Sequence, residues 1–205
     1  MRISDKFLKA RLIPGFDKEI WQPCSTKGLR ITPIPAPENI TGVTVDVHLD
    51  TEFQLTELYL QPIDGTGFID LGSSKAELSE IASTKCFIPH SGSFILQPGG
   101  FCLGCTAETI EIPKTLVGWL DGRSTLARFG LLVHVTAHRV DPGWNGKVVL
   151  EFYNAGAWPL RLQPGMKIGA MSFEEINGSV DIGYGDRTDA SYQDQQSVVL
   201  PGGGK

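Results

Sequence analysis

One acidic residue, Glu151, interrupts an otherwise apolar stretch that spans residues 148–153. If this stretch is a strand, a period of two places Glu151 on one face and Leu150 and Phe152 on the other. A carboxylate at such a position either points to solvent, which is the more common case, or lies in a pocket. In a pocket, burial would raise the pKa of the carboxyl and a neighbouring arginine would lower it, so the two effects together could poise the group for proton transfer.

A turn rich in arginine and hydroxyl side chains precedes this strand. Arg123 is followed by Ser124 and Thr125, and Arg128 comes three residues later. Between residues 121 and 151 the chain carries four basic and three acidic side chains, a balance of +1, whereas the whole chain carries −5. Backbone N–H groups and hydroxyls of such a turn can donate to a phosphate, and guanidinium groups can neutralise it. The alternative, which composition alone slightly favours, is that the arginines form ordinary surface ion pairs with these acidic residues.

The cysteines and histidines do not follow a known metal-binding pattern. Cys102 and Cys105 have the spacing of a metal or redox pair, but no suitable second pair of ligands accompanies them. We therefore expect them to be small buried side chains of a strand. The zinc signature of nucleobase deaminases, H-x-E followed by P-C-x-x-C, is absent, as are the glycine-rich phosphate-binding patterns. His134 and His138 are expected to be strand histidines with backbone partners rather than catalytic groups.

The composition suits a folded domain that binds small molecules. The 205 residues are 41% hydrophobic and 20% charged, which argues against disorder. No stretch approaches the roughly 18 consecutive apolar residues of a membrane helix, and the first residues lack the apolar segment of a secretory signal, so we expect a cytoplasmic protein. A net charge of −5 argues against nucleic acid or an anionic membrane as the partner, although a small anion could bind a local cationic pocket.

The elements that position these residues should be mainly strands. The chain contains 24 glycines and 13 prolines, which interrupt it often. Apolar and polar residues alternate over 43–49, as in a strand with one buried face. From Leu116 onward, turn dipeptides separate short apolar runs, which predicts a meander or barrel. These dipeptides are Asp121-Gly122, Pro142-Gly143, Asn145-Gly146 and Pro164-Gly165.

Two short helices and two irregular segments complete the prediction. Ser4 can cap the first helix, and Ser74 with Glu77 has the capping-box spacing ahead of the second. The proline-rich residues 13–40 are expected to form a long irregular surface loop. The tail, residues 197–205, is expected to be flexible.

Several motifs together resemble the bacterial dCTP deaminases of the dUTPase-like superfamily. They comprise residues 122–128, 134–144 and 149–154, with shorter matches at 1–5, 45–47, 163–166 and 192–196. Separate motifs in the right order make chance similarity improbable. The resemblance implies a single domain over residues 1–205, a mainly β fold, and a distorted β-barrel of the dUTPase-like (β-clip) type with a few short helices.

This resemblance implies metal-free hydrolytic deamination of dCTP to dUTP and ammonia, which supplies dUMP for thymidylate synthesis. Glu151 would take a proton from water and pass it to N3 of cytosine while the hydroxide attacks C4. Protonation of the ring would replace the activation that zinc gives in other deaminases. Ser124 would help to hold the water, and Arg128 would keep Glu151 ionised.

The resemblance also implies a nucleotide-binding set. The turn from Arg123 to Arg128, together with Gln195, matches triphosphate or nucleotide contacts, and the backbone at Ala137 matches contacts to the cytosine edge. Asp141 and Tyr184 match the deoxyribose and base region. The complete set is Arg123, Ser124, Thr125, Leu126, Ala127, Arg128, Ala137, Asp141, Val149, Leu150, Glu151, Tyr184 and Gln195.

The expected ligands and partners follow from the same resemblance. Mg²⁺ would arrive on the triphosphate without a protein ligand, and no zinc is expected. Ser191 stands where the family commonly has a lysine, so a terminal phosphate contact could be missing, and Arg187 is a candidate replacement. The partners are dCTP as substrate, dUTP as product, dTTP as an inhibitor and two further copies of the chain in a homotrimer with sites between subunits.

Two other functions remain open from the sequence. One is a dUTP diphosphatase, or a bifunctional enzyme that both deaminates dCTP and hydrolyses dUTP. The other is a trimer that binds nucleotides without catalysis. Residues 138–144 resemble the branch that only deaminates, and a carboxylate beside a neutral base is not needed for binding alone, so deamination is the prediction.

Overall fold

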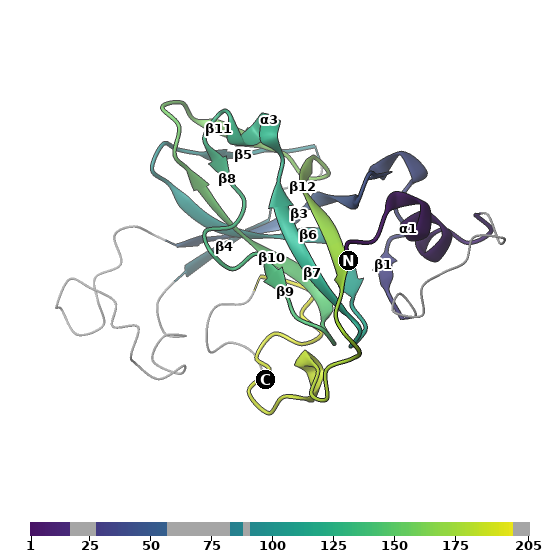
Figure 1. The fold of residues 1–205 in the computed structure, drawn as a ribbon. Helices are drawn as coiled ribbons and strands as arrows, with labels where there is room; N and C mark the ends of the chain where they lie inside the picture. The colour runs from purple at the N-terminus through teal and green to yellow at the C-terminus, as the bar shows by residue number, and fades with distance from the viewer. Residues whose placement is uncertain (17–27, 57–82, 88–90, 199–205) are drawn as a thin grey trace.

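The computed structural model describes residues 1–16, 28–56, 83–87 and 91–198, and their regular structure consists mainly of antiparallel strands (Figure 1). The strands are β1 (Arg30–Thr32), β2 (Ile40–Thr41), β3 (Thr44–Thr56), β4 (Ser83–Phe87), β5 (Phe94–Leu96), β6 (Phe101–Glu111), β7 (Leu116–Gly122), β8 (Leu131–Leu132), β9 (Arg139–Val140), β10 (Asn145–Asn154), β11 (Leu160–Leu162) and β12 (Lys167–Glu175). The helices are α1 (Asp5–Leu12), α3 (Ser124–Ala127) and the 3-10 turns η2 (Pro37–Asn39) and η3 (Tyr184–Asp186). The mainly β prediction is confirmed.

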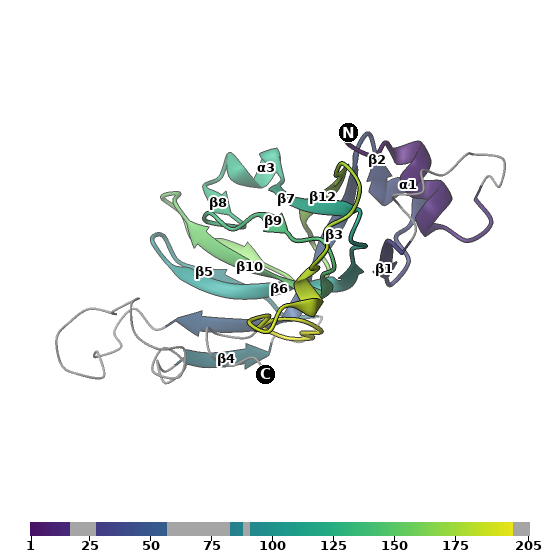
Figure 2. The same ribbon diagram turned by 60° about the horizontal axis from the view of Figure 1, so that its bottom comes forward.

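A single curled sheet organises these strands. Its order is β8-β10-β6-β3-β12-β7-β9, while β5 and β11 form a separate two-stranded sheet. The first part of β3 pairs with β12 and the later part pairs with β6 and β4, so this long strand belongs to both halves of the curl. Figure 2 shows β7 and β12 lying over β6 and β10. The result is a half-barrel rather than a flat sheet.

The inward faces of the strands build one hydrophobic core. Val45 and Val47 of β3 are fully buried, which confirms the predicted alternation within the strand, whereas Val43 precedes the strand and is exposed. Leu150 and Phe152 of β10 and Phe173 of β12 are fully buried in the same cluster. Each such side chain stabilises the fold by roughly 1.5–3 kcal/mol. The core therefore fixes the face of β10 that does not carry Glu151.

The first predicted helix is present as α1. Its Leu8 is fully buried, and the backbone N–H of Ile3 donates to Phe173 O (2.9 Å), which anchors the helix on β12. Ser4 occupies the N-cap position, but its side chain makes no capping hydrogen bond. The helix predicted after Ser74 lies outside the described residues. Within the described part of the chain, no helix has the length and apolar character needed to cross a membrane.

Strand pairing overrides two of the turn predictions. Asp121 and Gly122 end β7, where Gly122 pairs with Gly169 of β12. Asn145 and Gly146 begin β10 and pair with β6. These two turn predictions were wrong because hydrogen-bonded neighbours on the sheet outweigh the local preference of Asp-Gly and Asn-Gly for turns.

The predictions for the remaining loops hold only in part. Gly143 and Gly165 have φ of +84° and +79°, as the two predicted Pro-Gly turns require. The region 13–40 is less irregular than expected, because it contains β1, which pairs with β6, and the turn η2. In the tail predicted to be flexible, 197–205, Val198 is fully buried, and residues 199–205 lie outside the described part.

Replacement of Gly130 tests how tightly the chain is packed between α3 and β10. Gly130 has φ of +91°, and a Cβ added there would lie 2.3 Å from the backbone N of Gly156. Gly130→Ala should lower the free energy of unfolding by about 3 kcal/mol, because backbone strain and overpacking add. The control is Gly165→Ala, with φ of +79° and no described atom within 4 Å of the added Cβ. It should cost about 1 kcal/mol. If urea unfolding gave equal losses of unfolding free energy for the two variants, the backbone at Gly156 would have to move to make room for the added Cβ.

Candidate active site

Strand β10 places Glu151 on its partly exposed face. Val149, Glu151 and Tyr153 lie on that face, and Leu150 and Phe152 lie in the core, as the alternation predicts. Glu151 pairs with β6 on one side, and its backbone N–H donates to Val133 O (3.1 Å) on the other. Leu150 is fully buried, so its predicted place beside a ligand stays a prediction.

One oxygen of the Glu151 carboxylate is held by the loop that follows β8. The backbone N–H of Val135 donates to Glu151 Oε2 (2.8 Å). Within the described residues, Oε1 makes no hydrogen bond. The loop continues to Ala137, which is exposed and was predicted to read the cytosine edge. The carboxylate is thus oriented by one donor and keeps one oxygen for a water or a ring nitrogen.

The rings of the two histidines of this loop pack against each other at a tilt. The ring centroids of His134 and His138 are 5.2 Å apart, and Trp119 lies against His138 at 5.4 Å. The backbone O of His138 accepts from the Leu120 N–H (2.8 Å). His134 Nδ1 is buried and has no hydrogen-bond partner among the described residues, so the expected backbone partner is not found for this nitrogen.

The arginine turn forms the short helix α3. Arg123 occupies its N-cap position, and its carbonyl accepts from the N–H groups of Leu126 (2.9 Å) and Ala127 (3.0 Å). Ser124, Thr125 and Arg128 are exposed along the turn. This arrangement presents hydroxyl groups and one guanidinium to solvent. Such groups can donate to an anion.

The arginines differ in their ion pairs. Arg123 Nη1 lies 2.6 Å from Asp46 Oδ1, whereas Arg139 Nε lies 2.7 Å from Asp141 Oδ1. The surface-pair alternative therefore holds for Arg139. Arg128 forms no ion pair within 4.0 Å in the described part of the chain, so a contact of Arg128 with Glu151 stays a prediction.

The turn and Glu151 lie at the same end of the molecule. Helix α3 lies beside β8, and β8 pairs with the end of β10 through Tyr153 and Leu132. The N–H of Ala155 donates to Gly130 O (2.9 Å), which closes the connection. Figure 1 shows α3 and β8 together at the top of the view.

A second group of predicted residues gathers at the other end. Tyr184 packs on Trp144, with ring centroids 5.1 Å apart, and Arg187 lies 5.7 Å from the Tyr184 ring. Arg187 also pairs with Asp141 (3.7 Å) and Asp189 (2.8 Å). Burial raises the pKa of Tyr184. Arg187, the predicted replacement for a phosphate-binding lysine, is therefore already engaged with two carboxylates.

Gln195 belongs to this second group and lies against the start of β10. The side-chain Nε2 of Gln195 donates to the backbone O of Lys147 (2.8 Å), and the backbone O of Gln195 accepts from the Lys147 N–H (2.9 Å). Its Oε1 is buried and has no partner among the described residues. The yellow segment that contains Gln195 lies at the bottom of Figure 1, opposite α3. One chain therefore does not bring all the predicted site residues together.

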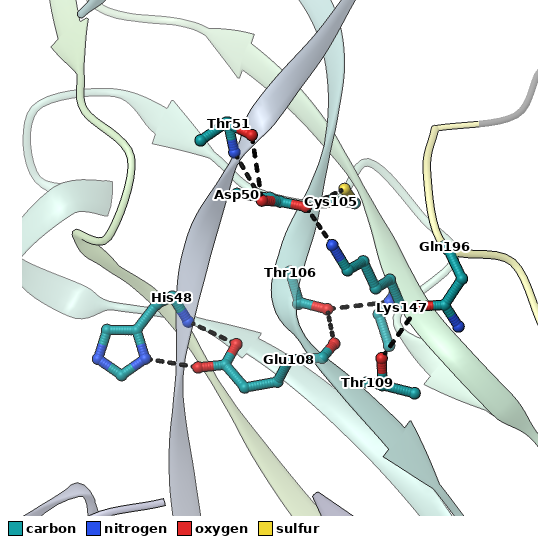
Figure 3. Close-up of polar contacts among 10 residues, drawn as sticks. His48, Asp50, Thr51, Cys105, Thr106, Glu108, Thr109, Lys147 and Gln196 are labelled. Atoms are coloured by element: carbon teal, nitrogen blue, oxygen red, sulfur yellow. Dashed lines mark hydrogen bonds and ion pairs between the residues drawn. The ribbon is translucent and has the colours of Figure 1, made fainter. Parts of the chain in front are cut away.

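A polar cluster behind the site was not predicted from the sequence (Figure 3). Lys147 Nζ forms an ion pair with Asp50, which also accepts from the Thr51 N–H (2.8 Å) and the Cys105 thiol (3.5 Å). Burial alone would raise the pKa of Asp50, but the hydrogen bonds from Lys147 and Thr51 outweigh it, so the pKa lies below its ordinary value. Only the register of β3, β6 and β10 brings these three strands' polar side chains together.

The neighbouring pair in Figure 3 joins β3 to β6. The His48 N–H donates to Glu108 Oε2 (2.9 Å), and His48 Nδ1 lies 2.6 Å from Glu108 Oε1. Glu108 is buried, so this carboxylate is satisfied by one residue of the next strand.

Cys102 and Cys105 are buried side chains of β6, as predicted. Burial raises the pKa of Cys102 to about 12 and shifts the pKa of Cys105 in the same direction. Neither thiol is a ready thiolate at neutral pH. In the described parts of the chain, no three His, Cys, Asp or Glu residues form a group that could hold a metal ion.

Comparisons with known proteins show what the chain is similar to. Residues 16–176 match the family model described as dCTP deaminase-like. The dCTP deaminase of Idiomarina loihiensis is 46% identical over 187 residues, which cover 89% of this chain and 93% of that protein. The dCTP deaminase of Pectobacterium atrosepticum is 45% identical over 203 residues, covering 97% and 96%. The crystal structure of 2'-deoxycytidine 5'-triphosphate deaminase from Agrobacterium tumefaciens shares the fold, with a TM-score of 0.57, 12% identity, and coverage of 85% of this chain and 48% of that chain.

The partly buried pair of Lys147 and Asp50 makes a testable contribution to stability. Asp50 keeps its charge to a lower pH in the folded protein than in the unfolded chain, so the pairing stabilises above the ordinary pKa of 3.8 and is lost as the pH falls through the lowered pKa. Lys147→Met should lower the free energy of unfolding by about 2 kcal/mol at pH 7. The difference from the wild type should shrink steadily below pH 3.8, which urea unfolding at several pH values measures.

A matched control is Lys9→Met, which removes the more exposed i,i+4 pair with Asp5 (3.4 Å) on α1. This change should cost only about 0.3–0.5 kcal/mol. If Lys147→Met cost as little, the pair in Figure 3 would not be a stabilising contact.

Proposed function

The chain belongs to the dCTP deaminase-like family, and from this membership we propose that it hydrolyses dCTP to dUTP and ammonia. Its curated relatives carry this activity in their names and match nearly their whole length. The observation that carries the proposal is Glu151, which is held on a rigid strand by the Val135 N–H and keeps Oε1 for the reaction. The resemblance found in the sequence motifs is confirmed.

Glu151 moves the protons of this hydrolysis. It takes one proton from a water molecule and delivers it to N3 of cytosine, while the water oxygen bonds to C4. It then takes the second proton from the new C4 hydroxyl and delivers it to the amino group, which leaves as ammonia while the C4 carbonyl forms. Both protons come from water, and the carboxylate is regenerated.

We assign the supporting roles by the same resemblance. Ser124, exposed at the start of α3, helps to hold the water, and Arg128 approaches Glu151 when the site is assembled. The exposed groups of the Arg123–Arg128 turn support binding of the triphosphate, and Mg²⁺ travels on the phosphate oxygens. Protonation at N3 supplies the activation of C4, so we assign no zinc.

The relatives favour deamination over the other functions open from the sequence. Both carry the name dCTP deaminase, and neither name includes hydrolysis of dUTP. We propose dTTP as the inhibitor to test first. A cytoplasmic location, expected from the sequence, fits a substrate drawn from the nucleotide pool.

We also propose that three copies of the chain assemble and share their sites. Two observations support this assembly. The Glu151 end exposes apolar side chains, including Phe129 (67% exposed) and Trp158 (80% exposed), and exposed apolar patches are typical of protein interfaces. The Tyr184 group lies at the opposite end, so a complete site needs the turn and Glu151 of one copy beside the Tyr184 and Gln195 of another.

Replacement of Glu151 tests the reaction. Glu151→Gln should lower dUTP formation from dCTP by about a thousandfold, because the amide cannot accept a proton. It should still bind dCTP in isothermal titration. The control is Glu38→Gln, an exposed residue of η2, which should behave as the wild type. Nucleotide chromatography with an ammonia assay measures the products. Undiminished dUTP from Glu151→Gln, or dUMP and pyrophosphate from the wild type, would refute the proposal.

Mixing two inactive variants tests the shared site. Glu151→Gln and Tyr184→Ala should each have little activity alone. After dissociation and joint reassembly at equal amounts, about a quarter of the sites should combine an intact Glu151 with an intact Tyr184 from a neighbour. Activity should return to about that fraction, and the assembly should have three times the 22.3 kDa chain mass. A monomeric mass, or no recovery on mixing, would place the whole site in one chain.

A further inference from the structure

We propose that Lys167 is a second phosphate-binding cation of the active site, held beside Arg123 by the carboxylate of Asp46, and that it favours nucleoside triphosphates over monophosphates. The proposal rests on the proposed function. No motif in the sequence singles out Lys167, which stands at the start of β12.

An irregularity in β12 turns Lys167 toward Asp46. The register between β12 and β3 shifts between Lys167 and Gly169, which is the mark of a β-bulge. In the strand register, Lys167 lies opposite His48 and Ala170 lies opposite Asp46. His48 and Asp46 are two residues apart on β3 and face the same side. Lys167 and Ala170 are three residues apart on β12, yet the bulge makes them face the same side too. Without the extra residue, Lys167 would point to the opposite face.

Asp46 is shared between two cations. Its Oδ1 lies 2.6 Å from Arg123 Nη1, and its Oδ2 lies 2.8 Å from Lys167 Nζ. The carboxylate side chain is only 16% exposed, whereas Arg123 and Lys167 are 36% and 39% exposed. The anion is therefore the inner partner, and both cations present remaining N–H donors outward.

The surrounding groups leave Lys167 available. His48, its neighbour across the strand pair, is bonded to Glu108. Asp121 pairs with Ala170 on the other side of β12 but forms no ion pair with Lys167 within 4.0 Å in the described residues. A single carboxylate thus balances two cations at one point, and the remaining positive charge favours a polyanion.

This point lies at the start of the turn already assigned to phosphate. Arg123 precedes Ser124 directly, so a cation that shares a carboxylate with Arg123 lies within reach of the same phosphate chain. Arg123 has a planar fork for one phosphate, whereas the ammonium of Lys167 is a point charge that suits a neighbouring phosphate oxygen. A monophosphate can satisfy only one of the two cations. A triphosphate can contact both.

Equilibrium binding in a Glu151→Gln background tests the inference without turnover. Adding Lys167→Met should weaken dCTP binding about tenfold, the loss of one charge-assisted contact, and leave dCMP binding within about twofold. The dissociation constant of inorganic tripolyphosphate, measured directly, should rise by about the same factor as that of dCTP. Lys167→Arg should restore most of the affinity. Lys9→Met, which removes a lysine paired with Asp5 on α1, should change nothing.

The same substitution with Glu151 intact should raise KM for dCTP about tenfold and leave kcat within about twofold. Unchanged dCTP affinity, or equal losses for dCTP and dCMP, would overturn the role of Lys167. If the wild type forms dUTP but Lys167→Met is unaltered, only this inference fails. If the wild type forms no dUTP from dCTP, the proposed function fails and the inference fails with it.

Discussion

The pairing of β10 between β6 and β8 is the constraint on which the candidate site depends. Leu150 and Phe152 are locked in the core, and the backbone of Glu151 is bonded to Val133. The Glu151 side chain therefore cannot move to the other face of β10 without disturbing core residues on both sides of it. The N–H of Val135 then selects one orientation of its oxygens. A side chain positioned in this way needs little reorganisation when substrate arrives, which is how a preorganised group lowers a barrier.

Electrostatics explains how an acidic chain can attract an anionic ligand. The carboxylate of Asp46 is the inner member of its ion pairs with Arg123 and Lys167, whereas Asp50 and its partner Lys147 are equally buried. Asp46 uses cations that remain partly exposed, whereas the Lys147 partner of Asp50 is mostly buried. Only the first arrangement offers positive charge to solvent. The net charge of −5 is thus compatible with a local anion site, because at Asp46 the negative charge lies inside and the positive charges lie nearer the surface.

Local patterns and motifs in the sequence were enough to predict the strand faces, the family and the fold. Alternation identified the faces of β3 and β10, and several motifs in the right order, including the one around Arg123, identified the family and the fold. The sequence did not predict the Lys147 and Asp50 pair or the role of Lys167, because these contacts depend on register and on a bulge that no local pattern reveals. The turn predictions at Gly122 and Gly146 were wrong for a related reason. Each glycine follows a turn-forming residue, Asp121 or Asn145, yet both glycines pair with a neighbouring strand of the sheet.

Strand β10 meets the C-terminal segment at one end and carries Glu151 four residues beyond Lys147. The bonds between Gln195 and Lys147 place that segment directly on the strand. In a shared assembly, the two ends of β10 would belong to different sites. Any lengthwise displacement of this strand therefore alters both sites together. Selection therefore acts on β10 through two sites at once. The sequence of β10 should change more slowly in evolution than the sequences of strands that only build the core.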